Sequence, residues 1–377
     1  MGAGAGQAER APMRSTALYA LLLTLGALDA AGYSLIAPVL PGLAAQTGAD
    51  ATAMGLLVAM FPLGMVAGFA LGGVVVRRGG SVRLLLMGLL LVAAGSLGFV
   101  FGADLTALAV SRLVMGLGSG CLWLGITFAT LAAWPGQEYL CMSRIYAAYS
   151  AGGLLGPLLG AVHGVRGPFV AYLTLVVLAV VPVATLRLPS VAGAFSADWR
   201  AVRSPGFLVA AASIAFAVMA LGTLEGVLPL HFGSRLRQSQ IGVLYAATSV
   251  LVVVVGAVAA RWQPRKVMLA STVPVAVGFA VAGAGSAVPV WIAALAVAGA
   301  GIGLANTGAT GILLDAVPAQ RIVTAMVLWS QIGILGYLIA PLFGGPAADA
   351  FGYGAVAAMI ALGAAALAVM LAQPRRA

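Results

Sequence analysis

Long apolar runs, separated by short polar segments, occupy nearly the whole of the 377-residue chain. A helix needs about 20 predominantly apolar residues to cross the hydrocarbon core of a bilayer. Twelve runs approach or exceed this length, and they predict helices at residues 15–39, 52–76, 84–101, 105–133, 142–164, 168–186, 205–230, 239–260, 267–285, 289–314, 322–345 and 352–372. The sequence therefore predicts an all-α integral membrane protein with twelve transmembrane helices.

The longest connection between these runs is the segment 187–204, which is the only one with several polar residues in a row. It has six runs before it and six after it. We therefore expect an N-terminal six-helix half at residues 1–186, a cytoplasmic linker at 187–204 and a C-terminal six-helix half at 205–377.

Composition agrees with a membrane protein and argues against a soluble one. Hydrophobic residues make up 62% of the chain and charged residues only 7%, whereas a soluble domain carries about 25% charged residues. The net charge of +10 raises the question of nucleic-acid binding. The arginines, however, are dispersed and lie at the ends of the apolar runs, which suits membrane orientation better than a phosphate-binding face.

The positions of the basic residues predict the orientation of the chain. If the N-terminus is inside, only Arg166, Arg235 and Arg237 of the 19 lysines and arginines fall in outer segments, and Arg112 lies within a helix. Basic residues collect in cytoplasmic loops. We therefore expect a multi-pass protein of the plasma (cytoplasmic) membrane with both termini in the cytoplasm.

Parts of the first half recur in the second half. Closely spaced glycines follow Arg112 in the fourth run and return 183 positions later, where Leu295 replaces the arginine; the two sets are Gly116, Gly118 and Gly120, and Gly299, Gly301 and Gly303. Residues 73–83 likewise return at 256–266, and residues 152–161 return at 336–345. Parallel halves of this kind are one of the repeat layouts of secondary transporters.

The repeated segments carry motifs by which the chain resembles the major facilitator superfamily, and within it the twelve-span drug:proton antiporters. The loop motif GxxxDRxGxxR matches at Gly73, Arg78, Gly80 and Arg83. The fourth-span motif RxxxGxG matches at Arg112, Gly116 and Gly118, with Gly120 following. The antiporter motif GxxxGPxxGG matches at Gly152, Gly156, Pro157 and Gly160, with Ala161 in place of the last glycine.

This resemblance implies two halves that rock around a central cavity, driven by a proton gradient and without a cofactor or metal. It also implies a monomer, which is the habit of the family. The antiporter motif would form a hinge or a seal between the halves, although glycine and proline are common in membrane helices generally. Arg77 stands where the loop motif has an aspartate. The charge relay in which that aspartate takes part in the family is therefore not expected of the arginines in this loop.

Asp29 is the acidic residue closest to the expected bilayer midplane. At about 1.5 Å per residue, it lies roughly 15 Å from the outer end of its predicted helix, and Arg112 lies roughly 10 Å from the outer end of its own. We expect the two to pair, and protonation of Asp29 to release Arg112. The resemblance implies the same proton-coupling roles. The alternative is a permanent ion pair that specifies helix packing.

Five further residues are candidates for contact with a substrate: Tyr33, Trp123, Glu225, Asn306 and Trp329. The resemblance implies that the aromatic residues and Asn306 lie around or near the cavity, where an apolar, aromatic lining would suit amphipathic molecules. Each of them could instead serve packing alone. Glu225 could face Arg112 or a cationic substrate, or it could lie in water at the outer interface. Asp50 is expected to cap a helix, and Asp104, Asp315 and Asp349 are interpreted as solvated caps at helix ends.

Two functions remain open on this evidence. The first is proton-coupled export of small organic molecules such as drugs or secondary metabolites, with lipid, protons and substrate as the partners. The second is uptake of a small metabolite by a symporter or uniporter, because a fold does not fix direction. An enzyme is not expected, since the chain lacks HExxH, GxSxG and a phosphate-binding glycine loop.

Overall fold

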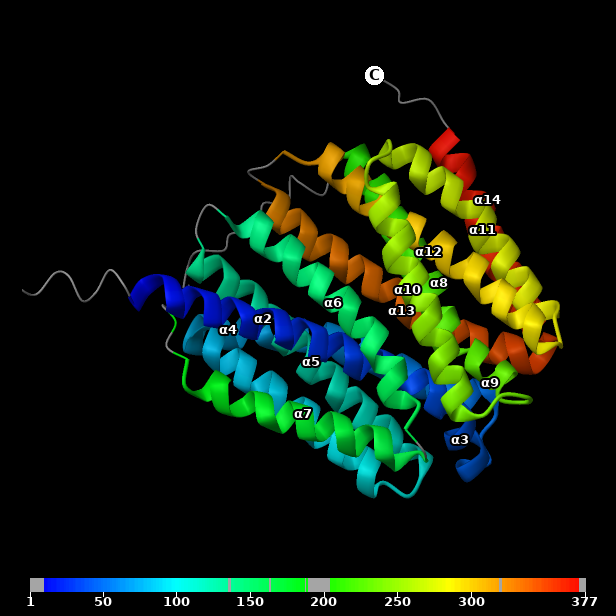
Figure 1. The fold of residues 1–377 in the computed structure, drawn as a ribbon, viewed down its shortest axis with the longest axis horizontal. Coiled ribbons are helices and arrows are strands. Elements are labelled where there is room, and N and C mark those ends of the chain that lie inside the picture. The colour runs from blue at the N-terminus through cyan, green and yellow to red at the C-terminus, as the bar shows by residue number, and fades with distance from the viewer. Residues whose placement is uncertain are drawn as a thin grey trace, which may run out of the picture.

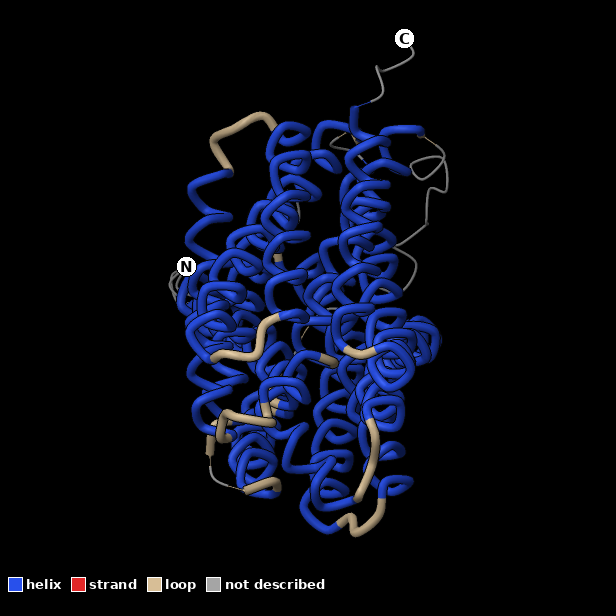
Figure 2. Tube along the Cα trace, turned by 90° about the vertical axis from the view of Figure 1, so that its right-hand side faces the viewer, coloured by secondary structure: helices blue, strands red, loops and turns tan. Residues whose placement is uncertain are grey.

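The computed structural model describes residues 10–134, 137–162, 164–186, 188, 204–318 and 321–372. Within these ranges the regular elements are helices (Figure 2). The first half contains α2 (Arg10–Ser34), α3 (Ile36–Thr47), α4 (Ala51–Phe101), α5 (Leu105–Ala133), α6 (Glu138–Gly160) and α7 (Arg166–Ala184). The second half contains α8 (Pro205–Gly226), α9 (Leu228–Phe232), α10 (Gln238–Ala259), α11 (Pro264–Ala284), α12 (Val288–Ala316), α13 (Ile322–Phe351) and α14 (Tyr353–Ala372). The predicted linker, 187–204, lies almost entirely outside the described residues.

These helices confirm the predicted membrane architecture. Eleven helical stretches among the described residues are long and apolar enough to cross a bilayer, and α6 supplies a further helix of 23 residues. The first stretch combines α2 with α3, the sixth combines α8 with α9, and α4 contains both the second and the third. The chain is therefore an all-α membrane protein.

Two helices extend beyond the predicted ends, and proline explains why the sequence misled. The first helix was expected to end at residue 39 but continues to Thr47. Pro38 lies in the first turn of α3, where a missing backbone N–H costs little. The eleventh helix was expected to end at residue 345 but continues through Pro346 to Phe351.

The second and third predicted helices meet at Gly80. The helical path of α4 is interrupted there, with φ 75° and ψ 175°. This region of backbone conformation is open essentially to glycine alone. The glycine of the loop motif therefore makes the turn between two membrane-crossing segments.

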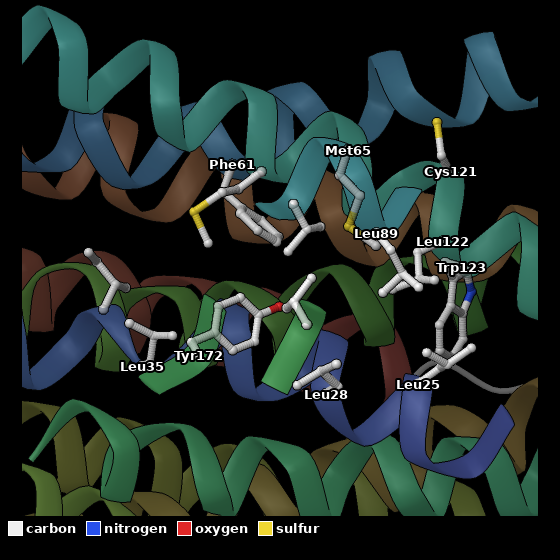
Figure 3. Packing of buried hydrophobic residues seen from close by; sticks show 14 of the residues in the cluster. Leu25, Leu28, Leu35, Phe61, Met65, Leu89, Cys121, Leu122, Trp123 and Tyr172 are labelled. Atoms are coloured by element: carbon white, nitrogen blue, oxygen red, sulfur yellow. The ribbon is translucent and has the colours of Figure 1, made fainter. Parts of the chain in front are cut away.

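Each half of the chain has its own apolar core. In Figure 1 the helices α2 and α4–α7 occupy the lower left and α8 and α10–α14 the upper right, while α9 lies beside α3 at the lower right. One buried cluster draws almost wholly on the first half, and a second draws almost wholly on the second half. Figure 3 shows part of the first cluster, in which Tyr172 and Leu28 lie across the interior from Phe61 and Met65.

The glycine repeat produces the same packing in both halves. In the first half, an added Cβ at Gly116 or Gly120 would overlap the first part of α4, and one at Gly118 would crowd Gly88 in its second part. In the second half, Gly299 and Gly303 face α10, whereas Gly301 faces α11. Two neighbouring helices thus approach the glycine-rich helix backbone to backbone in each half, as expected for small-residue interfaces.

The helix ends define two faces of the molecule. The terminal face carries the start of α2 at Arg10 and the end of α14 at Ala372. The distal face carries the ends of α3 at Thr47, of α6 at Gly160 and of α9 at Phe232, toward the lower right of Figure 1.

Candidate transport site

Arg112 is the largest charged group buried in the first half. Its side chain on α5 is fully buried. Nη1 donates to the carbonyl oxygen of Gly32 at 3.3 Å, and Nη2 donates to that of Tyr33 at 2.9 Å. Cζ lies 4.5 Å from the centre of the Phe61 ring, a distance that favours attraction between a cation and an aromatic face. Arg112 is thus held by neutral acceptors, with Nε left without a hydrogen-bond partner.

The acceptors lie where the first helix is interrupted. The α-helical path ends at Ser34 and resumes at Ile36. Gly32 and Tyr33 lie in the last turn before this interruption, and it is their carbonyl oxygens that Arg112 reaches. The arginine therefore ties α5 to the junction of α2 and α3.

Asp29 lies one turn earlier on α2 and is also buried, with 2% of its surface exposed. Its Oδ2 atom has no hydrogen-bond partner. Ser119 on α5 lies within interaction range of the Asp29 carboxyl group, although the Ser119 hydroxyl forms no hydrogen bond of standard geometry. A buried carboxyl oxygen without a partner is costly, which makes Asp29 a candidate for a role beyond packing.

The expected ion pair between Asp29 and Arg112 is not formed in this structure. The depth of Asp29 was predicted from a helix end at residue 39, whereas the first helix continues to Thr47. Asp29 consequently lies beside Ser119, about two helical turns from Arg112 on α5. The guanidinium group extends the other way, to Gly32 and Tyr33. The proton-coupling role of the two residues stays a prediction.

Glu225 is buried on α8, with 4% of its surface exposed, so it does not lie in water at an interface. Its Oε2 atom accepts a hydrogen bond from the Tyr337 hydroxyl at 3.1 Å. The Tyr337 ring lies 4.2 Å from the ring of Tyr33, and the Tyr33 carbonyl binds Arg112. A continuous line of contacts therefore joins the buried arginine of one half to the buried glutamate of the other. Glu225 also lies within electrostatic range of Arg112 without forming an ion pair.

The remaining candidates for substrate contact lie elsewhere. Trp123 packs on Tyr146 and Tyr149 of α6, with ring centres 5.0 and 5.2 Å away. The indole nitrogen of Trp329 donates to the Ala210 carbonyl at 3.1 Å, within the second half. Asn306 is half-buried on α12. The structure thus brings Tyr33 and Glu225 close together through Tyr337. The contacts of Trp123 and Trp329 described above involve other residues, and Asn306 lies on a different helix.

The antiporter motif lies mainly against the first helix of its own half. An added Cβ at Gly152 would overlap the carbonyl of Ala27, one at Gly156 would overlap the Ser34 hydroxyl, and one at Gly160 would overlap the Leu35 carbonyl. Pro157 behaves differently, because its carbonyl lies against Gly242 of α10 in the other half. The motif was expected between the halves, and only the part around Pro157 has that position.

The loop motif is described in part. Gly80 makes the turn already noted, Arg83 is exposed, and an added Cβ at Gly73 would meet no atom within 4 Å. The side chains of Arg77 and Arg78 lie outside the described residues.

Sequence reasoning missed Tyr337, Phe61 and Ser119. Tyr337 lies within the repeated segment 336–345, but its partner Glu225 is 112 residues away, and nothing in the spacing links them. Ser119 lies between two glycines of the fourth-span motif. That motif predicts close backbone packing and does not indicate a role for the Ser119 hydroxyl.

Comparison with known sequences agrees with this architecture. The family model of the major facilitator superfamily matches residues 22–255 and 227–377. The quinolone resistance protein NorA of Staphylococcus aureus (strain MRSA252) is 28% identical over 130 residues, which is 34% of each chain. The uncharacterized MFS-type transporter YttB of Bacillus subtilis (strain 168) is 29% identical over 115 residues, 30% of this chain and 29% of that one. These matches therefore span about a third of the length of either relative.

Solved transporters share the fold over nearly the whole chain. The nucleoside transporter NupG aligns with a TM-score of 0.71 at 14% identity, covering 94% of this chain and 98% of that one. The inward-open xylose transporter XylE from E. coli aligns with a TM-score of 0.72 at 14% identity, covering 94% and 95%. At sequence identities this low, the similarity indicates a shared fold and nothing about substrate or direction of transport. Together with the family model, which spans both halves, they show that the chain belongs to the major facilitator superfamily of transporters.

Proposed function

We propose that this transporter exports small amphipathic organic molecules in exchange for protons. The observation that carries the proposal is the pair of buried acids, Asp29 and Glu225, placed around a buried arginine that neither acid neutralises directly. Ionisable groups within membrane-spanning helices are expensive and are functional candidates by default. The antiporter motif and the partial similarity to NorA add support for export.

In this proposal Arg112 has two alternative partners. When Asp29 carries a proton it offers no charge, and the guanidinium rests on the carbonyls of Gly32 and Tyr33, as observed. When Asp29 loses its proton, the carboxylate attracts Arg112 and pulls α5 relative to α2. Gly116, Gly118 and Gly120 would let α5 shift against its neighbours, because they remove side chains from the contact.

Movement in the first half would reach the second half through the tyrosine pair. Tyr33 provides both the acceptor for Arg112 and the ring that lies on Tyr337. Tyr337 in turn donates to Glu225. A shift of the Tyr33 backbone would therefore disturb the hydrogen bond of Glu225, which links the two acids.

The predicted orientation assigns a state to this structure. If the termini are cytoplasmic, the distal face is the outer face of the plasma membrane. Pro157, Gly160 and Gly345 there lie in contacts between the two halves, so in this proposal the structure is a state whose outer side is closed.

Uptake of a metabolite is the second candidate function, because nucleoside and xylose transporters have the same fold. Direction can be tested by the accumulation of a fluorescent lipophilic cation and a neutral drug in cells that express the chain. Export predicts lower accumulation than in cells with Arg112→Ala, and a protonophore should abolish the difference. Accumulation above that of the Arg112→Ala cells would contradict export and favour uptake.

A further inference from the structure

Asp349 joins the two halves at the distal face. It lies near the end of α13 in the second half, and its side chain reaches the first turn of α4 in the first half. Oδ1 accepts from the backbone nitrogen of Ala51 at 3.2 Å. Oδ2 accepts from the backbone nitrogen of Thr52 at 2.7 Å and from the Thr52 hydroxyl at 2.6 Å. One carboxylate thus receives three hydrogen bonds from a helix that begins 298 positions earlier.

The chemistry of this contact is favourable for a carboxylate. The first backbone N–H groups of a helix have no partner within the helix, and the helix dipole places partial positive charge there. Hydrogen bonds to an ionised acceptor are stronger than those between neutral groups. Asp50 already caps the same helix by accepting from the Ala53 nitrogen at 2.8 Å, and Asp349 satisfies the N–H groups that Asp50 leaves.

Backbone packing holds Asp349 against this helix end. An added Cβ at Gly345, one turn before Asp349, would overlap the carbonyl of Ala51. An added Cβ at Gly55, one turn into α4, would overlap the carbonyl of Pro341. The two helices therefore cross in direct contact, and any separation of the halves at this face would break all three hydrogen bonds.

A second side chain binds across the same face. The Gln238 amide nitrogen, at the start of α10, lies 2.7 Å from the carbonyl oxygens of Gly160 and Val162 and 3.0 Å from that of Gly164. These carbonyls belong to the end of α6 and the turn after it, in the first half. Both side chains serve free helix ends of the opposite half, one at an N-terminus and one at a C-terminus.

We propose that Asp349 is a latch that stabilises the closed distal face, and that it must release α4 each time this face opens. The latch sets the ratio of closed to open molecules and thereby the rate of the step that opens the distal face. It acts in either direction of transport and for any substrate, so it goes beyond the proposed export function and does not depend on it.

The latch can be tested by measuring a distance across the distal face in the full-length protein. Cysteines at the exposed positions Gln46 and Ser286 would carry spin labels, with Cys121 and Cys141 replaced by serine. Electron–electron resonance in liposomes then gives the fractions of short and long distances. We expect Asp349→Asn to raise the ratio of open to closed molecules roughly tenfold, the scale of losing charge-assisted hydrogen bonds.

Asp104→Asn is the matched control. Asp104 is also an exposed aspartate that caps a helix at the distal face, where it accepts from the Ala107 nitrogen at 2.8 Å. Asp104 and its partner Ala107, however, both belong to the first half. The latch predicts an unchanged distance distribution for Asp104→Asn. Equal shifts in both variants would overturn it, because they would reflect the loss of any helix cap, and no shift in Asp349→Asn would overturn it as well.

Thr52→Val provides a second variant on the other side of the contact. It removes one donor and leaves the backbone N–H groups and Asp349 in place. We expect a smaller shift in the same direction and no additional shift in the Asp349→Asn background. If Asp349→Asn does not yield folded protein, an unchanged distribution in Thr52→Val overturns the proposal. These distances are read without substrate or a proton gradient, so an error in the proposed export function would leave the test intact.

Discussion

Two adjacent glycines of the antiporter motif should respond oppositely to the same substitution. Gly152 is buried, and an added Cβ would overlap the backbone of Ala27 on α2. Gly153 is half-buried, and an added Cβ would meet no atom within 4 Å. We therefore expect Gly152→Ala to destabilise the protein and Gly153→Ala to leave it unchanged or slightly more stable.

The size of the difference follows from this geometry. Replacing a glycine within a helix by alanine stabilises the helix by about 0.5–1 kcal/mol, and this gain is common to both variants. It cancels when the two are compared. The remaining steric cost at Gly152 is that of overpacking, about 1–3 kcal/mol. The upper part of this range applies, since the atoms in the way belong to backbone and not to a flexible side chain.

Thermal unfolding of the purified variants in one detergent, at one heating rate, measures this difference. Gly152→Ala should unfold several degrees below Gly153→Ala, and Gly153→Ala should retain transport. Equal unfolding temperatures would refute the reasoning, because they would mean that α2 and α6 can separate at this contact without cost.

Three further substitutions test other contacts. Arg112→Lys keeps the charge but loses the planar pair of donors, so substrate-driven proton movement in vesicles should fall sharply at an unchanged protein level; normal activity would contradict the role of the two carbonyl contacts. Tyr337→Phe leaves a Glu225 oxygen without its donor while preserving the ring against Tyr33, and should lower stability by about 1–3 kcal/mol, measured by thermal unfolding against wild type. Gly80→Ala should cost about 1–3 kcal/mol by the same measurement because of its backbone conformation, although no neighbouring atom obstructs a Cβ; an unchanged unfolding temperature would contradict the observed turn.

The membrane architecture could be predicted from the sequence because a bilayer imposes a minimum length on each apolar run. The repeat could be predicted because its glycines occupy equivalent contacts: an added Cβ would overlap a backbone carbonyl at Gly120 in the first half and at Gly303 in the second. The ends of the helices were less predictable. Proline ends a helix in one context and is accepted in the first turn in another, so Pro38 gave no reliable boundary.

The geometry of the site could be predicted only along the helix axis. Counting residues places Asp29 and Arg112 inside the membrane, and both are buried as expected, but their relative depth was misjudged because the first helix continues to Thr47. Counting does not give the direction in which each side chain extends, which depends on how α2 packs against α5. The long side chain of Arg112 reaches the carbonyl oxygens of Gly32 and Tyr33, close to the interruption between α2 and α3. The apolar pattern of residues 15–39 does not predict this interruption.

Asp349 shows a second limit of sequence reasoning. At the end of a helix it was interpreted as a solvated cap, and the residue is indeed exposed. Its partners are the backbone N–H groups of residues 51 and 52, which no local pattern connects with residue 349. Contacts between the halves arise from the tertiary arrangement. The local sequence around an aspartate is the same whether its side chain caps another helix or is hydrated by water.

Substrate-triggered proton release is the most direct test of the proposed coupling. Inside-out vesicles with an acidic interior and a pH-sensitive dye would receive a panel of lipophilic cations and neutral drugs. The account predicts that wild type releases protons on addition of a substrate and that Asp29→Asn, produced at the same level, does not. Equal release by Asp29→Asn would contradict the central claim, because a residue that cannot exchange a proton would then support full coupling.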